Sequence, residues 1–245
     1  MSGSILVSDF IEERWGARLD GAAPGMSRVV LGPQGPTSDP ASIQVAFFSG
    51  DVYPERSRDF LLPLLDCAGL RWLHSFSAGV DHPIFHHFLE RGVRLSTSSG
   101  ASAATVAETV LLYMLCLSRD YRRWEEARSR RAWEPHAVRE LRGASLAIVG
   151  LGPIGEAVAT MAAAFGMDVV ALTRSPRAGA AFAVRPLGDL DAVLAEADYV
   201  VLALPLVPQT RGLLDRRRLA LLRPTSFLIN VARGELVDEP ALVQA

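Results

Sequence analysis

Short apolar runs rich in β-branched residues recur through the first hundred positions, and segments of helix or loop length separate them. These runs cover residues 5–7, 29–31, 45–48, 72–74 and 93–95. One connecting segment, residues 54–67, carries apolar residues at helical spacing, so we expect a helix there. Strands that alternate with helix-length connections are typical of a parallel sheet covered on both faces. The pattern therefore predicts an α/β fold.

A polar break at residues 98–100 interrupts this rhythm, and we place a domain boundary near Gly100. The next segment, residues 105–118, has almost no polar face, which predicts a buried helix between two domains or between subunits. Thr105 and Glu108 have the spacing of a capping box at its start. Further on, the pattern predicts strands over 145–149, 169–172, 181–184, 199–204 and 227–231 and a helix over 154–165.

Three glycines follow the strand expected at 145–149 in the pattern G-x-G-x-x-G, as Gly150, Gly152 and Gly155. The first glycine permits a tight turn, the second lets the backbone approach a pyrophosphate, and the third lets the helix pack against the strand. Glycines also mark ordinary turns, but here strand, turn, helix and second strand follow in order. The motif therefore predicts a dinucleotide site.

The end of the second strand in this unit distinguishes NAD from NADP. An NAD site usually has an acidic residue there, about 20 residues after the glycines, for the ribose hydroxyls. This chain instead has Thr173, Arg174 and Ser175, with Arg177 close behind. A guanidinium and a hydroxyl can bind a 2′-phosphate, so we predict NADP, with NAD as the alternative. The alternative is that Arg174 faces solvent and binds no phosphate.

Composition excludes several mechanisms. The 245 residues have a net charge of −2, and all 25 basic residues are arginine. Without lysine there is no Schiff base, no phosphate-loop lysine and no Tyr-x-x-x-Lys dyad. The balanced charge predicts neither nucleic acid nor an anionic membrane as a partner. The arginine-rich segment 119–131 also carries acidic and aromatic residues, which favours a solvated helix face over a nucleic-acid site.

Two distant cysteines, Cys67 and Cys116, are expected to be free thiols, and we expect a cytoplasmic protein without a membrane span. No metal is indicated, because the pair His82 and His86 lacks an intervening glutamate and an obvious third ligand.

Five segments together resemble the D-2-hydroxyacid dehydrogenase family. They are 77–81 (SAGVD), 105–108 (TVAE), 150–155 (GLGPIG), 204–210 (LPLVPQT) and 228–238 (LINVARGELVD). The resemblance implies two Rossmann-like doubly wound parallel-sheet domains. Residues 1–99 would form a flavodoxin-like substrate-binding domain, and residues 100–245 an NAD(P)-binding Rossmann domain. It also implies hydride transfer between NADP(H) and a small 2-oxo or 2-hydroxy acid, such as glyoxylate or hydroxypyruvate, in a cleft between the domains.

Site residues follow from the same resemblance. Arg233 matches the catalytic arginine, whose planar fork can bind a carboxylate and polarise a carbonyl. The alternative is a loop arginine paired with an acidic neighbour. Amides near Ala78 and Gly79 match a second carboxylate contact. The remaining matches concern the cofactor: Pro153 and Ile154 at the pyrophosphate, Leu204, Pro205 and Thr210 near the adenosine, and Val231 and Ala232 beside the nicotinamide.

Two departures from the family pattern accompany the match. Five strands are expected in the second domain, whereas a complete dinucleotide-binding sheet has six. The family's acid histidine and its carboxylate partner follow the arginine motif, and this sequence shows neither before Ala245. We therefore expect a cofactor domain that is incomplete at its carboxyl end, in a chain that is inactive alone and that is poorly soluble or self-associates. The alternative function is a dinucleotide-binding sensor or scaffold without turnover. A homodimer is expected from the resemblance alone.

Overall fold

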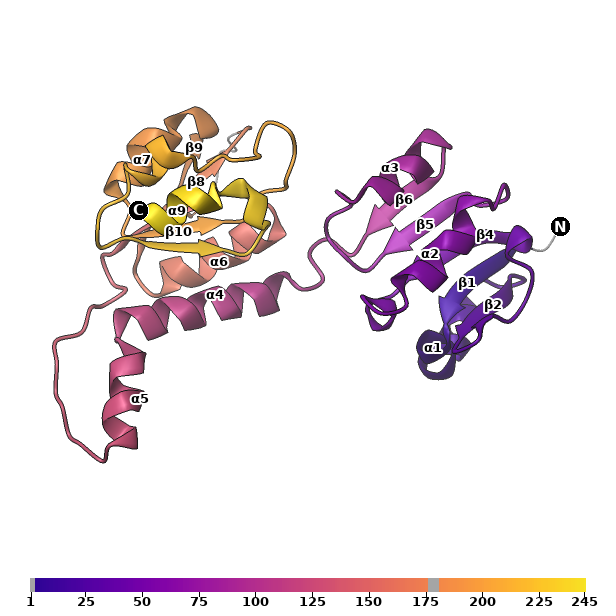
Figure 1. The fold of residues 1–245 in the computed structure, drawn as a ribbon, viewed down its shortest axis with the longest axis horizontal. Helices are drawn as coiled ribbons and strands as arrows, with labels where there is room; N and C mark the ends of the chain where they lie inside the picture. The colour runs from indigo at the N-terminus through magenta and orange to yellow at the C-terminus, as the bar shows by residue number, and fades with distance from the viewer. Residues whose placement is uncertain (1–2, 176–180) are drawn as a thin grey trace. The chain divides into compact units, whose positions relative to one another are not determined.

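The computed structural model describes residues 3–175 and 181–245, which divide into two compact units between Ser99 and Gly100. Each unit contains one mainly parallel sheet with helices between its strands (Figure 1). This arrangement confirms the predicted α/β class with two Rossmann-like parallel sheets. The predicted strands all form, with ends displaced by up to two residues.

The sheet of the first unit has the order β3-β2-β1-β4-β5-β6. Its strands are β1 (Ser4–Ser8), β2 (Ser27–Gly32), β3 (Gly35–Pro36), β4 (Ile43–Phe48), β5 (Trp72–Ser75) and β6 (Arg94–Thr97). All pairs are parallel except β2 with β3, which form a short hairpin. The helices are α1 (Asp9–Ala22), α2 (Ser57–Leu65) and α3 (Pro83–Glu90), with 3-10 turns at Pro40–Ser42 and Gly50–Val52.

Two apolar clusters cover opposite faces of this sheet, because alternate residues of a strand point to opposite sides. Leu6 of β1 belongs to the larger cluster, which includes Phe60 of α2 and Phe88 of α3. Ile5 packs on the other side with Ile11 of α1. Both clusters draw only on residues of the first unit.

In the second unit all strand pairs are parallel, in the order β11-β10-β7-β8-β9. The strands are β7 (Ser145–Val149), β8 (Asp168–Thr173), β9 (Ala183–Pro186), β10 (Tyr199–Leu202) and β11 (Phe227–Asn230). The helices are α4 (Ala103–Ser118), α5 (Tyr121–Ser129), α6 (Pro153–Ala164), α7 (Leu190–Glu196), α8 (Arg216–Leu219) and α9 (Glu239–Gln244). Two 3-10 turns lie at Leu187–Asp189 and Gly234–Leu236.

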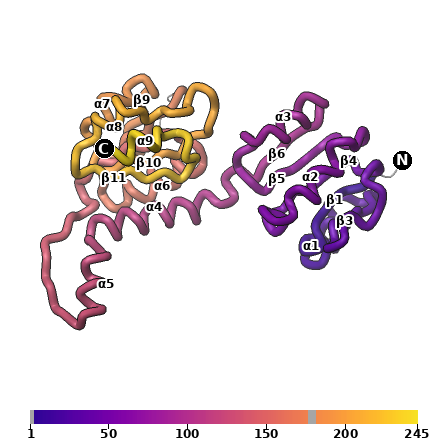
Figure 2. Tube along the Cα trace, in the orientation of Figure 1, coloured from indigo at the N-terminus to yellow at the C-terminus, as the bar shows by residue number. Residues whose placement is uncertain are grey.

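Helices cover both faces of the second sheet (Figure 2). Ile148 of β7 packs with Met114 of α4 and Val158 of α6 on one side. Its neighbour Val149 packs with Leu194 of α7 on the other. This alternation explains why β7 is apolar at nearly every position, as expected for a central strand.

The structure corrects the prediction at the start of α4. This helix begins at Ala103 with Ser102 as its N-cap, so Thr105 lies inside it and forms no capping box. The Thr105 carbonyl instead accepts a hydrogen bond from the Thr109 hydroxyl at 3.0 Å. A second correction concerns the helix predicted over 54–67, which occupies only Ser57–Leu65.

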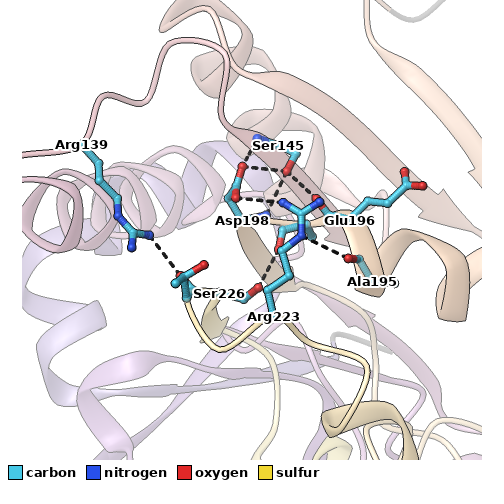
Figure 3. A network of polar contacts seen from close by, with 9 residues as sticks. Arg139, Ser145, Ala195, Glu196, Asp198, Arg223 and Ser226 are labelled. Atoms are coloured by element: carbon cyan, nitrogen blue, oxygen red, sulfur yellow. Dashed lines mark hydrogen bonds and ion pairs between the residues drawn. The ribbon is translucent and has the colours of Figure 1, made fainter.

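A polar network joins three strands at the amino end of the second sheet (Figure 3). Asp198 accepts hydrogen bonds from the Ser145 amide and hydroxyl, both at 2.9 Å, and from Arg223 at 3.2 Å. Ser226 donates to the Ala197 carbonyl at 2.7 Å. Burial raises the pKa of Asp198, but the hydrogen bonds from Ser145 and the charge of Arg223 outweigh it, so the pKa lies below its usual value. The network links the amino ends of β7, β10 and β11 to one another.

Residues 119–140 form an arm that extends from α4 (Figure 1). Within α5 only Ala127 is buried, which agrees with the solvated helix predicted for this arginine-rich segment. Trp133, in the segment after α5, is 92% exposed. None of the helices in the described part of the chain has the length and apolarity needed to cross a bilayer.

Candidate dinucleotide and substrate site

The order of the second sheet reverses between β7 and β10, which lie side by side. In open parallel sheets, ligands bind outside the carboxyl ends of the strands at such a reversal. The glycine turn follows β7, and the segment beginning at Leu204 follows β10. Both segments are attached to neighbouring strands, since Gly150 N donates to Leu172 O at 2.9 Å and Ala203 N to Val149 O at 2.8 Å.

The three glycines of the turn differ in their surroundings. Gly150 has a φ of +106°, and a Cβ there would lie 2.6 Å from Ala203 O. A Cβ on Gly155 would lie 2.1 Å from Gly150 O. Gly152 is different, because a Cβ there would meet nothing within 4 Å among the described residues. Gly150 and Gly155 thus allow close packing of the main chain, whereas Gly152 faces open space.

The open space at Gly152 lies at the amino end of α6, for which Gly152 is the N-cap. A glycine has no side chain with which to cap the helix, and Pro153 at the first position has no N–H. The N–H groups of the first turn, beginning with Ile154, have no partner within a helix and carry its positive partial charge. These features fit a pyrophosphate, which needs close backbone approach and N–H donors.

The end of β8 carries no acidic side chain among the residues that the structure describes. Thr173 ends the strand half-buried, and Arg174 and Ser175 follow it exposed to solvent. Arg177, which we also expected here, lies outside the described residues. The chemistry of this edge is therefore that of a guanidinium and two hydroxyls.

The segment after β10 is organised by Thr210. This side chain is 6% exposed, and its hydroxyl lies 2.8 Å from Pro205 O. It also accepts a hydrogen bond from Val207 N at 2.9 Å. Leu204 is buried against the α7 side of the sheet. Thr210 and Leu204 thus shape the loop from within, and Pro205 lies exposed on it.

Arg233 lies in the turn after β11, exposed and with extended backbone at φ −140° and ψ 141°. Its Nη1 donates to the carbonyl of Ala232 at 3.0 Å. Asn230 reaches forward from the strand end: its Nδ2 donates to Arg233 O at 2.7 Å, and its Oδ1 accepts from Ala232 N at 3.0 Å. Val231 is attached to β10 through its N–H, which donates to Leu202 O at 3.2 Å. Sequence reasoning identified Arg233, Val231 and Ala232 but missed Asn230.

The Arg233 turn and the Thr210 loop are also hydrogen-bonded to each other. Gly212 N donates to Glu235 O at 2.8 Å, Leu214 N to Leu236 O at 3.0 Å, and Asp238 N to Leu214 O at 3.0 Å. Leu214 and Val237 form a parallel bridge. The structure therefore brings together at one edge the glycine turn, the end of β8, the Thr210 loop and the Arg233 turn.

Ala78 and Gly79 lie in the first unit, in the turn after β5. Ser77 organises this turn, because its hydroxyl donates to Gly79 O at 2.8 Å and lies 2.8 Å from the Ser75 hydroxyl. No hydrogen bond recorded within the described residues uses the N–H groups of Ala78, Gly79 or Val80. Successive N–H groups of this kind fit a carboxylate.

A family model described as the NAD binding domain of D-isomer specific 2-hydroxyacid dehydrogenase matches residues 111–245, more than half of the chain. The chain belongs to the D-isomer specific 2-hydroxyacid dehydrogenase family. The matched residues contain the glycine turn, the end of β8, the Thr210 loop and the Arg233 turn.

Relatives of this dehydrogenase-family chain include reductases of small acids. Hydroxypyruvate reductase from Thermotoga maritima is 33% identical over 168 residues, which are 68% of this chain and 54% of that protein. A 2-hydroxyacid dehydrogenase from Xanthobacter autotrophicus Py2, solved with NADPH and MES, is 28% identical. The match has a TM-score of 0.78 and covers 100% of this chain and 76% of the other.

An NADPH-dependent glyoxylate/hydroxypyruvate reductase from Sinorhizobium meliloti, solved with NADP and sulfate, is 27% identical with a TM-score of 0.76. That match covers 100% of this chain and 77% of the other. The chain spans between about a third and just over half of the length of the curated relatives that it matches.

The histidines of this 2-hydroxyacid dehydrogenase chain all precede the glycine turn in sequence. His82 caps α3 by accepting from Ile84 N at 3.2 Å, while His86 and His87 lie exposed on that helix. His74 contacts the hydroxyls of Ser96 and Ser98 at 2.9 and 3.0 Å, and burial lowers its pKa. The described residues contain no cluster of three metal-binding side chains.

Proposed function

We propose that this protein transfers hydride between NADP(H) and a small 2-oxo or 2-hydroxy acid such as glyoxylate or hydroxypyruvate. The observation that carries the proposal is the placement of Arg233 on the same sheet edge as the open Gly152 turn. The glycine turn follows β7 and Arg233 follows β11, with β10 between them, so a dinucleotide site and a carboxylate-binding guanidinium would share the carboxyl edge of one sheet. The names of the Thermotoga maritima and Sinorhizobium meliloti relatives agree with this substrate class.

The glycine turn would hold the pyrophosphate of the dinucleotide. The first-turn N–H groups of α6 would donate to its oxygens, and Gly152 would leave room for close approach. Val231 and Ala232 would border the nicotinamide, and the Thr210 loop the adenosine side. When bound, NADPH supplies the hydride.

Arg233 would bind the substrate carboxylate through its planar fork and stabilise the negative charge that develops on the carbonyl oxygen. In the first unit, the N–H groups of Ala78 and Gly79 would be donors to a carboxylate. Oxamate, a non-reducible analogue of a 2-oxo acid, tests this assignment. We expect Arg233→Gln to weaken oxamate binding to the NADPH-loaded protein by about 100-fold, as loss of a charge-assisted pair predicts. Unchanged oxamate affinity would contradict it.

NADP preference would depend on Arg174 and Ser175. A guanidinium at the end of β8 favours a 2′-phosphate, whereas the ribose hydroxyls of NAD call for a carboxylate. We expect Arg174→Ala to weaken NADPH binding by about tenfold or more and leave NADH binding within twofold, measured by fluorescence titration. Arg71→Ala, an exposed arginine of the first unit, is the matched control. Tighter binding of NADH than NADPH by the wild-type protein would refute the preference.

We infer a homodimer from the apolar surface of α4 and the arm. Leu112 and Tyr113 of α4 are 57% and 54% exposed, and the exposed Trp133 lies on the arm. Large apolar side chains exposed on a helix and on an extended segment would be covered in a dimer interface. Light scattering should give twice 26.4 kDa for the wild-type chain, and Leu112→Glu should give 26.4 kDa. A wild-type monomer would refute the dimer.

A further inference from the structure

Asn230 is the last residue of β11, and its side chain contacts the turn that contains Arg233 at two points. The Nδ2 group donates to the Arg233 carbonyl at 2.7 Å. The Oδ1 atom accepts from the Ala232 N–H at 3.0 Å. One amide side chain therefore uses its donor and its acceptor on the two sides of the arginine.

These two contacts restrict the direction in which the Arg233 side chain leaves the main chain. The Ala232 N–H belongs to the peptide unit between Val231 and Ala232, and the Arg233 carbonyl belongs to the unit that follows Arg233. Because both units are held to one side chain, the main chain between them, and with it the Cα–Cβ bond of Arg233, has less freedom to turn. Carboxylate recognition by a guanidinium is bidentate and depends on this direction, so small displacements cost affinity.

Side-chain chemistry makes asparagine specific for this task. Aspartate has the same shape and retains the acceptor, but it cannot donate to the Arg233 carbonyl when ionised. Serine and threonine offer a single hydroxyl on a shorter side chain. Asn230 is also the only asparagine among the 245 residues.

We propose that Asn230 is a positioning residue, which holds the main chain on both sides of Arg233 so that the guanidinium meets the substrate carboxylate. The inference rests on the proposed function of Arg233 and extends it to a residue that does not itself touch substrate. The proposed pyrophosphate and 2′-phosphate contacts, in the glycine turn and at Arg174, lie on other strands. Ala232 is proposed beside the nicotinamide, so we expect loss of the Asn230 contacts to weaken dinucleotide binding much less than oxamate binding.

Two titrations test the proposal: NADPH into the protein, and oxamate into the NADPH-loaded protein. We expect Asn230→Asp and Asn230→Ala to raise the Kd of oxamate about tenfold and leave the Kd of NADPH within twofold. Ser226→Ala is the matched control. It removes one side-chain hydrogen bond at the opposite end of β11, to Ala197 O, and should change neither Kd.

Two results would overturn the proposal. Oxamate binding by Asn230→Asp at the wild-type affinity would show that the donor to Arg233 O has no role. Equal loss of NADPH and oxamate affinity in the Asn230 variants would show a general collapse of the edge instead of positioning.

A second measurement keeps the inference separate from the proposed substrate. Because the chain has one asparagine, labelling with ¹⁵N-asparagine gives a single side-chain amide pair in the NMR spectrum. We expect one proton of that pair to exchange with water at least tenfold more slowly than a free amide. If the NADPH-loaded protein did not bind oxamate, the proposed substrate would be wrong, and slow exchange would still support the Asn230 contact. Exchange at the free rate would overturn it.

Discussion

Gly150, Gly152 and Gly155 look equivalent in the sequence, but the space around each one differs. Gly150 and Gly155 are packed against main-chain atoms, and Gly150 also needs a positive φ that other residues rarely adopt. Gly152 has an ordinary extended backbone at φ −91° and ψ −172° with open space around it. Substitution therefore separates the contribution of each glycine to folding from its contribution to binding.

We expect Gly155→Ala to lower the free energy of unfolding by roughly 2–4 kcal/mol, because its Cβ would overlap Gly150 O. Gly152→Ala should leave the thermal midpoint within about 2 °C and weaken NADPH binding at least tenfold, because the new methyl group occupies the space proposed for the pyrophosphate. Calorimetry and fluorescence titration measure the two effects. An unchanged NADPH affinity in Gly152→Ala would place the dinucleotide elsewhere.

The sequence predicted the glycine turn because few other residues permit such a turn, and the structure shows its close packing at Gly150 and Gly155. The role of Arg233 stays a prediction from its motif. Sequence reasoning missed Asn230, since a single polar residue after a strand is unremarkable until its partners are known. The capping box at Thr105 was wrong for the opposite reason: the pattern was present, but the helix begins two residues earlier, at Ala103. Ends of elements depend on contacts that a local pattern does not contain.

At the scale of elements, the amino end of the second sheet depends on one carboxylate. Asp198, just before β10, is held by Ser145 at the start of β7 and by Arg223 before β11, and its pKa is lowered in the folded protein. Because the pKa of Asp198 is lower in the folded protein than in the unfolded chain, its carboxylate stabilises the fold at pH values above the unfolded pKa, near 3.8. This stability is lost as the pH falls through the folded pKa. We expect the wild-type chain to lose more stability than Asp198→Asn between pH 5 and pH 2. Urea unfolding at several pH values measures the difference, and parallel curves would contradict it.

A comparable contact holds two helices of the first unit together. Arg91, which follows α3, donates to the Leu64 and Cys67 carbonyls at 3.0 and 2.5 Å and also to Leu65 O, at the end of α2. The last carbonyls of a helix have no partner within it, so this guanidinium replaces water there.

We expect Arg91→Ala to cost about 2–3 kcal/mol of stability, measured by denaturant unfolding. Arg91→Lys should recover less than half of that, because an ammonium lacks the planar fork. Arg58→Ala, an exposed arginine on α2, is the control and should stay within about 0.5 kcal/mol of wild type. Equal losses at both positions would mean that α2 is sensitive to any lost charge.

At the scale of the whole molecule, the apolar clusters found among the described residues each consist of residues from one unit. This division into two units could be predicted from the sequence, because the first series of apolar runs stops at the polar break at residues 98–100. The sequence could not supply the contacts between distant segments, such as the bridge between Leu214 and Val237.

Separate cores predict that a ligand of the second unit stabilises only that unit. At NADPH concentrations 100 times the Kd, the gain is about 2.7 kcal/mol, or roughly 100-fold slower exchange of amides that open only on global unfolding. We expect this slowing in β7 and β10 and less than twofold change in β1 and β4, measured by hydrogen exchange with mass spectrometry. Equal slowing in both units would show that they unfold as one.

The hydrogen bonds between residues 212–214 and 235–238 also bear on how this protein could be redesigned. An engineer who wished to change the contacts proposed for the adenosine side would graft the loop after β10 from a relative, and one who wished to change the acid substrate would graft the turn after β11. Either graft alone would place the main chain of the introduced segment against the native segment that faces it, and the hydrogen bonds between the two would not match. The two segments therefore constitute a single exchangeable cassette, and a chimera should take residues 204–238 as one piece.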